Sequence, residues 1–219
     1  MKYISLNHNS SPTSFKKAVI NGLAPDKGLY FPEEKVKLSR NFIESIKNID
    51  DTEICYEIIR EFIGDEIPKN KLLEIINNTI SFKIPLKKIE KSIYSLELFH
   101  GPTLAFKDIG AKFMASCLDF FKDSYTSKKI TVLVATSGDT GGAVAKGFSD
   151  TKDIDVCILY PKGKISKVQE KQITTNGSYV QAIEVEGDFD MCQSMVKRAF
   201  SDEEINRKIA LTSANSINV

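Results

Sequence analysis

The chain has 219 residues, of which 42% are hydrophobic and 27% charged, with a formal net charge of +1. This composition suits one or two globular domains, and a charge near zero does not indicate a nucleic-acid or acidic-membrane partner. No apolar run reaches the roughly 18 residues that span a bilayer, and the first residues lack the apolar segment of a signal peptide, so we expect a cytoplasmic protein.

Residues 1–82 are predicted to form a mostly helical N-terminal region after a short strand. Ser14 is a candidate helix cap, and residues 22–32 form a turn-rich loop. Asp51 is predicted to cap an amphipathic helix whose apolar residues recur at helical spacing. A further helix is expected to begin at Pro68 and to run to about Ile76, since proline is well tolerated in the first turn.

Residues 83–219 are predicted to form an α/β domain. Apolar and polar residues alternate over 94–98, as in a half-buried strand, and a helix is expected from about 106 to 122. Strands and helices then alternate, with strands at 130–135, 154–160 and 179–185, and helices at 141–148, 166–174 and after Asp188. This pattern predicts a parallel sheet covered by helices on both faces, with ligands at the carboxyl ends of the strands.

The four cysteines are scattered and form no C-x-x-C pair, and there are two histidines. Each cysteine lies among apolar neighbours in a predicted helix or strand, so we expect buried, reduced thiols. No cluster has the spacing of metal ligands, and no metal site is predicted. The cysteines are Cys55, Cys117, Cys157 and Cys192.

Lys107 lies at the start of the predicted helix that follows the loop 99–106. Its charge would face the positive end of the helix dipole, at a cost of roughly 0.3–1 kcal/mol. Burial adds to this effect, and both favour the neutral amine that forms a Schiff base with an aldehyde cofactor. The alternative is a surface lysine whose ammonium extends past the helix start into water.

A glycine-rich segment, Ala135-Thr136-Ser137-Gly138-Asp139-Thr140-Gly141, joins a predicted strand to a predicted helix. Its hydroxyls and the free N–H groups of the helix start suit a carboxylate or a phosphate. It matches neither G-x-G-x-x-G nor the P-loop, and a tight strand-to-helix turn is the alternative. Asp139 would repel an anion, so it makes better sense beside a positive group.

Together these two segments resemble the threonine synthase family, which belongs to the tryptophan-synthase-like (fold type II) enzymes that use pyridoxal phosphate (PLP). The matching stretches are 96–108 and 135–141. Further similarity lies at 22–32, 158–163, 185–190 and 215–218, so the resemblance covers essentially the whole chain in order. Related PLP lyases usually carry asparagine at the position of Asp139.

The resemblance implies a role for each site residue. Lys107 would bind PLP covalently and move protons. Phe106 and Asp108 would frame it, and the turn would contact the cofactor or the substrate carboxylate through Ser137, Gly138, Asp139, Thr140 and Gly141. The family converts O-phospho-L-homoserine and water to L-threonine and phosphate. Substrate contacts are expected from Ser137, Thr140, His100, Thr103, Asn215, Ser216 and Asn218, although His100 has the alternative role of holding its loop by a hydrogen bond.

The chain departs from the family in length, since threonine synthases are roughly twice as long and their glycine-rich loop for the PLP phosphate lies further along. We therefore expect a fragment that binds PLP weakly or not at all, does not turn over substrate, and forms homo-oligomers or precipitates through exposed apolar surface. The alternatives are another fold type II lyase, such as a threonine dehydratase or cysteine synthase relative, a non-catalytic relative that binds phosphate-bearing small molecules, and a structural or interaction module.

Overall fold

The computed structural model describes residues 1–124 and 128–214. These residues divide into two compact units, the first ending at Asn78 and the second beginning at Thr79. The boundary expected from sequence, after residue 82, lies a few residues beyond this division. No helix among the described residues is long and apolar enough to cross a bilayer.

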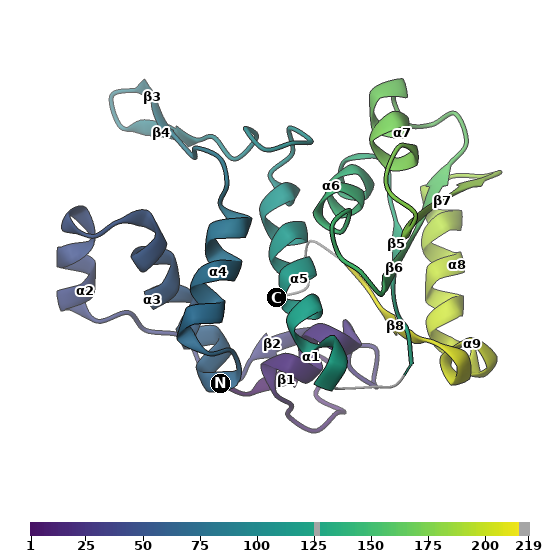
Figure 1. The fold of residues 1–219 in the computed structure, drawn as a ribbon, viewed down its shortest axis with the longest axis horizontal. Coiled ribbons are helices and arrows are strands. Elements are labelled where there is room, and N and C mark those ends of the chain that lie inside the picture. The colour runs from purple at the N-terminus through teal and green to yellow at the C-terminus, as the bar shows by residue number, and fades with distance from the viewer. Residues whose placement is uncertain (125–127, 215–219) are drawn as a thin grey trace. The chain divides into compact units, whose positions relative to one another are not determined.

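The first unit combines a two-stranded antiparallel sheet with helices (Figure 1). Its strands pair Tyr3 with Pro32, and its buried side chains include Ile63, Leu72 and Ile75. The elements are β1 (Tyr3–Ser5), α1 (Phe15–Asn21), β2 (Tyr30–Pro32), α2 (Arg40–Ser45), α3 (Asp51–Ile63) and α4 (Lys69–Thr79).

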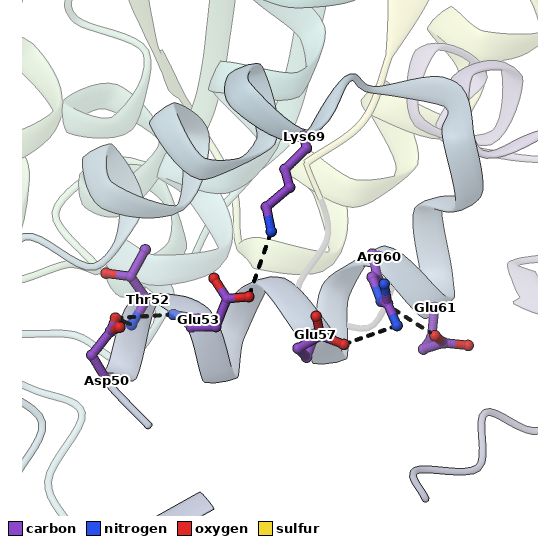
Figure 2. Close-up of polar contacts among 7 residues, drawn as sticks. All are labelled: Asp50, Thr52, Glu53, Glu57, Arg60, Glu61 and Lys69. Carbon is purple, nitrogen blue, oxygen red and sulfur yellow. Dashed lines mark hydrogen bonds and ion pairs between the residues drawn. The ribbon is translucent and has the colours of Figure 1, made fainter. Parts of the chain in front are cut away.

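The helix caps of this unit follow the sequence closely, with one correction. Ser14 caps α1 as predicted, because its hydroxyl accepts a hydrogen bond from the backbone N–H of Lys17. The cap of α3 is Asp50 and not Asp51. The Asp50 carboxylate accepts from the backbone N–H groups of Thr52 and Glu53, at 3.0 and 3.1 Å (Figure 2). Asp50 has the extended backbone that a cap requires, whereas Asp51 is already helical.

Ion pairs lie on the surface of α3 and between α3 and α4, as Figure 2 shows. Arg60 lies 2.9 Å from Glu57 and 3.5 Å from Glu61, and Lys69 lies 3.5 Å from Glu53. Pairs that are this open to water contribute about 0–1 kcal/mol each. Burial of apolar side chains between the elements therefore dominates the stability of this unit.

Two carboxylates of the first unit bind backbone N–H groups. Glu66 accepts from Phe15 and Lys16 at the start of α1, at 2.8 and 3.0 Å. Asp26 accepts from the hydroxyl of Ser5 at 2.6 Å and from the backbone of Gly28 at 3.0 Å. These bonds favour the charged form, with the Ser5 hydroxyl contributing most, and so lower the pKa of Asp26.

The second unit carries the predicted parallel sheet. Its four strands lie in the order β7-β6-β5-β8, all parallel, with α5 and α6 on one face and α8 on the other (Figure 1). The predicted fold class is thereby confirmed. The elements are β3 (Leu86–Glu90), β4 (Ile93–Leu96), α5 (Lys107–Phe121), β5 (Ile130–Ala135), α6 (Asp139–Gly147), β6 (Ile154–Pro161), α7 (Lys167–Thr174), β7 (Val180–Val185), α8 (Phe189–Ser201), α9 (Glu203–Lys208) and β8 (Ala210–Thr212).

The core of this unit is built on β5 and β6, which are buried along most of their length. Leu133, Leu159 and Val185 form a cluster with Cys192 of α8. Parallel strands buried on both faces read as continuous apolar runs, which is why residues 130–135 could be assigned from sequence.

The strand predicted over 94–98 is corrected by the structure. The observed strand, β4, pairs antiparallel with β3 in a separate hairpin, with Leu86 opposite Leu96. It is also not half-buried, since Tyr94 and Leu96 are 53% and 57% exposed. Alternation of apolar and polar residues indicates a strand but does not identify its neighbour or what covers its apolar face.

The cysteines are free thiols, as predicted. Cys117 and Cys192 are buried, whereas Cys55 and Cys157 are only half-buried, so the expectation of burial is wrong for these two. Burial raises the pKa of each thiol, and that of Cys117 rises far above its ordinary value.

Candidate functional site

The loop that leads into α5, residues 101–106, is fixed by a carboxylate from the first turn of that helix. Asp108 is 4% exposed and accepts from both the backbone N–H of Thr103, at 3.0 Å, and the Thr103 hydroxyl, at 2.5 Å. Its charge is also favourable at the helix start. Gly101 is required here, because a Cβ at this position would lie 2.5 Å from the Asp108 carboxylate.

Lys107 is the first residue of α5, as predicted, and its side chain is 17% exposed. Its Nζ lies 3.6 Å from Oδ2 of Asp139, at the start of α6, and 4.3 Å from the centre of the Phe106 ring. The two segments singled out in the sequence therefore meet. The site therefore brings together a primary amine, a carboxylate and the face of an aromatic ring, at the end of the sheet where β5 finishes.

The glycine-rich turn is organised by a residue that the sequence reasoning missed. Thr136 is 1% exposed, and its Oγ1 accepts from the backbone N–H groups of Gly138, at 3.0 Å, and Gly141, at 2.8 Å. Gly138 has a φ of 133°, a conformation that side chains disfavour. This turn lets α6 begin at Asp139, two residues before the predicted Gly141.

The remaining polar groups of this turn face outward to different degrees. The side chain of Ser137 is exposed and that of Thr140 is half-buried. Both hydroxyls lie at the N-terminus of α6, where the helix dipole and N–H groups favour an anion. The turn thus places two hydroxyls and a helix start next to the Lys107–Asp139 pair.

Two glutamines of α7 also contact the site, and neither was anticipated. Gln169 donates from Nε2 to Oδ1 of Asp139 at 2.7 Å, and Gln172 donates to the carbonyl oxygen of Thr103 at 3.3 Å. The capping box of Ser166 and Gln169 is readable from the sequence. The tertiary contacts of the two glutamines are not, because they join segments far apart in the chain.

The other predicted substrate contacts are placed differently. The His100 ring nitrogen Nε2 lies 2.8 Å from the Glu97 carboxylate, and the centre of its ring lies 4.9 Å from that of the tilted Phe99 ring. The Thr103 hydroxyl is used by Asp108. Asn215, Ser216 and Asn218 lie outside the described residues.

Two sequence families match the chain, and they place this fold and site in a class. Residues 2–80 match the family described as "Threonine synthase N terminus", and residues 74–218 match "Pyridoxal-phosphate dependent enzyme". The chain belongs to the family of pyridoxal-phosphate-dependent enzymes, and its fold is that of fold type II.

Within this family the chain is similar to threonine synthases. It is 43% identical to the threonine synthase of Escherichia coli (strain K12) and 45% identical to that of Haemophilus influenzae, in each case over the whole chain and 50% of the relative. The crystal structure of the E. coli enzyme matches with a TM-score of 0.90 at 44% identity. A PLP-bound threonine synthase from Brucella melitensis matches with a TM-score of 0.90 at 36% identity, over 48% of its length. The chain spans about half the length of these relatives.

The residues present fit the reactive end of PLP. The cofactor is an aldehyde, which condenses with a primary amine, and Lys107 offers one that is largely shielded from water. The facing Asp139 carboxylate balances the positive charge of that nitrogen when it is protonated.

Proposed function

We propose that this chain is the lysine-bearing half of a threonine synthase, which converts O-phospho-L-homoserine and water into L-threonine and phosphate with PLP. The observation that carries the proposal is the pairing of Lys107 with Asp139 at 3.6 Å, between the two segments that resemble the family. The identities to threonine synthases across the whole chain support it. A cytoplasmic location is part of the proposal and rests on the sequence.

When bound, PLP supplies an electron sink that stabilises negative charge on the substrate carbon next to the amino group. The protein has to position groups around that carbon. We assign to Lys107 the covalent attachment of the cofactor and the transfer of protons through its Nζ. Asp139 holds that nitrogen in place and balances its charge, and the Phe106 ring shields one side of it.

The substrate carboxylate is assigned to the start of α6. Ser137 and Thr140 offer hydroxyl donors there, and the hydrogen bonds from the N–H groups of Gly138 and Gly141 to the Thr136 hydroxyl order the turn that carries them. His100, Thr103, Asn215, Ser216 and Asn218 remain proposed substrate contacts. For His100 and Thr103, the observed hydrogen bonds support loop-holding roles beside any contact with substrate.

The cofactor assignment is tested by trapping. The chain is incubated with PLP, reduced with borohydride, digested and analysed by mass spectrometry, which captures even a weakly held aldehyde. Lys112 is a matched control, since it lies on the same helix, is 29% exposed and sits 3.4 Å from Asp150. We expect the label on Lys107 to exceed that on Lys112 several-fold, and Lys107→Arg to remove the excess. Equal labelling of the two lysines would contradict the assignment.

The reaction is tested in a chimaera in which this chain replaces the matching half of the E. coli threonine synthase. We expect threonine and phosphate to form from O-phospho-L-homoserine, and Lys107→Ala to abolish both. A chimaera that holds PLP but processes a different amino acid would redirect the proposal to another PLP lyase.

Self-association is a further part of the proposal. The hairpin β3–β4 exposes large apolar side chains, which favours homo-oligomers. Sedimentation velocity over a range of concentrations tests this, and a monomer at every concentration would exclude it. The exposed side chains are Leu86, Ile89, Ile93, Tyr94 and Leu96.

A further inference from the structure

The carboxamide of Gln169 lies between a helix cap and the site. Its Oε1 accepts from the backbone N–H of Ser166 at 3.1 Å, while its own backbone N–H donates to the Ser166 hydroxyl at 3.2 Å. Its Nε2 donates to Oδ1 of Asp139 at 2.7 Å. One side chain therefore links the start of α7 to the carboxylate that faces Lys107.

The chemistry of the donors fixes which way this carboxamide points. A backbone N–H only donates, so the carboxamide oxygen must face Ser166 and the NH₂ group must face Asp139. An NH₂ group also only donates, and it is best matched by a carboxylate oxygen. Asp139 is thus held between two donors, with Oδ1 toward Gln169 and Oδ2 toward Lys107.

The glycine-rich turn is shaped around the same side chain. A Cβ at Gly138 would lie 2.4 Å from Cδ of Gln169, so a side chain at this position would displace the carboxamide. The positive φ of Gly138 is therefore not the whole reason for a glycine here. The absence of a side chain lets the turn pack directly against Gln169.

Gln172 makes a similar contact with the lysine loop, residues 101–108. It lies three residues after Gln169, on the same face of α7. Its Nε2 donates to the carbonyl oxygen of Thr103 at 3.3 Å, and its Oε1 lies 3.0 Å from where a Cβ of Gly142 would be. One face of α7 therefore contacts both loops of the site through two uncharged side chains.

We propose that Gln169 is a positioning residue that aims the Asp139 carboxylate at Lys107, and that Gln172 aligns the lysine loop with it. This inference deepens the proposed function and rests on the role given there to Lys107. The competing explanation is that Gln169 serves only the capping box of α7, in which a glutamate can also serve as the partner.

The two explanations predict opposite results for Gln169→Glu. Glutamate keeps the cap but places a second carboxylate against Asp139. We expect Gln169→Glu to lower the melting temperature and Asp139→Asn/Gln169→Glu to restore it, because the asparagine then donates to the glutamate. A Gln169→Glu variant that melts at or above the wild-type temperature would overturn the proposal.

A second readout connects Gln169 to the lysine. Among the described groups, Lys107 is paired with Asp139 of α6, Asp108 of its own helix faces Thr103, and α7 reaches the site through its two glutamines. A carboxylate beside an ammonium stabilises that charged form. Freeing Asp139 should therefore change the profile of PLP trapping on Lys107 measured against pH.

We expect Gln169→Met to move that profile in the same direction as Asp139→Asn does, and the double variant to move it no further than Asp139→Asn alone. Ser166→Ala is the matched control, since it loses the hydroxyl of the cap but keeps the carboxamide, and its profile should equal the wild-type profile. A Gln169→Met profile equal to that of Ser166→Ala would overturn the proposal. If wild-type Lys107 is not trapped in excess of Lys112, the proposed function fails, while the melting experiment still decides the Gln169–Asp139 contact.

Discussion

The lysine loop, residues 101–108, and the glycine-rich turn, residues 135–141, meet at one site but are held by different groups. The lysine loop is fixed by a buried carboxylate, Asp108, and the turn by a buried hydroxyl, Thr136. The side chains assigned to chemistry are more open, with Lys107 17% and Asp139 60% exposed. In both loops the residue that holds the backbone is therefore buried, while the side chain proposed for the chemistry is more open to solvent.

Removing the buried carboxylate of Asp108 should have the largest effect on the stability of the fold. Asp108→Ala leaves the hydroxyl and N–H of Thr103 without their buried acceptor, and we expect it to reduce the free energy of unfolding by about 3 kcal/mol. Urea denaturation measures this loss. Asp108→Asn keeps one acceptor oxygen and should lose clearly less. Equal losses in the two variants would show that packing, and not hydrogen bonding, matters at this position.

Removing the buried hydroxyl of Thr136 should reduce the stability of the fold by less. Thr136→Val has nearly the same shape but no acceptor for the N–H groups of Gly138 and Gly141, and we expect a loss of about 2 kcal/mol. Thr136→Ser is the control, since it keeps the hydroxyl and should stay closer to wild type. The same denaturation experiment applies. A valine variant as stable as the serine variant would mean that the turn does not depend on this hydroxyl.

Asp26 of the first unit extends the comparison to a half-buried carboxylate. Its folded pKa lies below the ordinary value of 3.8, chiefly because of the Ser5 hydroxyl. A lowered pKa means that the carboxylate stabilises the fold above the ordinary value, and that this contribution is lost as the pH falls through the folded value. Asp26→Asn should therefore melt below wild type at pH 7, and the difference should disappear in strong acid. A difference independent of pH would refute this explanation.

The smallest effect is expected for chemical modification of the buried thiol in α5. Cys117 lies on the helix that begins with Lys107, but it is fully buried, and burial raises the pKa of its thiol. Iodoacetamide at mildly alkaline pH should leave Cys117 unmodified in the folded chain and modify it in urea, as peptide mass spectrometry would show. Rapid modification of the folded chain would mean that α5 opens readily, and the fixed position of Lys107 would then be in doubt.

Much of this arrangement was readable from the sequence, for reasons that are local. The apolar run at 130–135 and the turn after it identify a buried strand that feeds a helix. The position of Lys107 in a first helical turn, and its meeting with Asp139 at the ends of elements in a parallel sheet, follow from the order of elements and the family resemblance.

What the sequence did not reveal depends on contacts between distant segments. Thr136 looks like any strand-end threonine until its hydroxyl is seen between two N–H groups, and Gln169 looks like a capping residue until Asp139 is placed beside it. The hairpin β3–β4 was misassigned because alternation does not specify a strand's partner. The short β8 has only three residues, too few to show a periodicity.

The contact between Lys107 and Asp139 is tested most directly by a zero-length cross-link. A carbodiimide activates a carboxylate, and an amine in contact with it then forms an amide bond with loss of water. We predict that digestion of the treated chain yields a peptide pair joined through Lys107 and Asp139, and that Asp139→Asn eliminates it. Lys107 joined instead to other carboxylates, with none of this pair, would contradict the site described above.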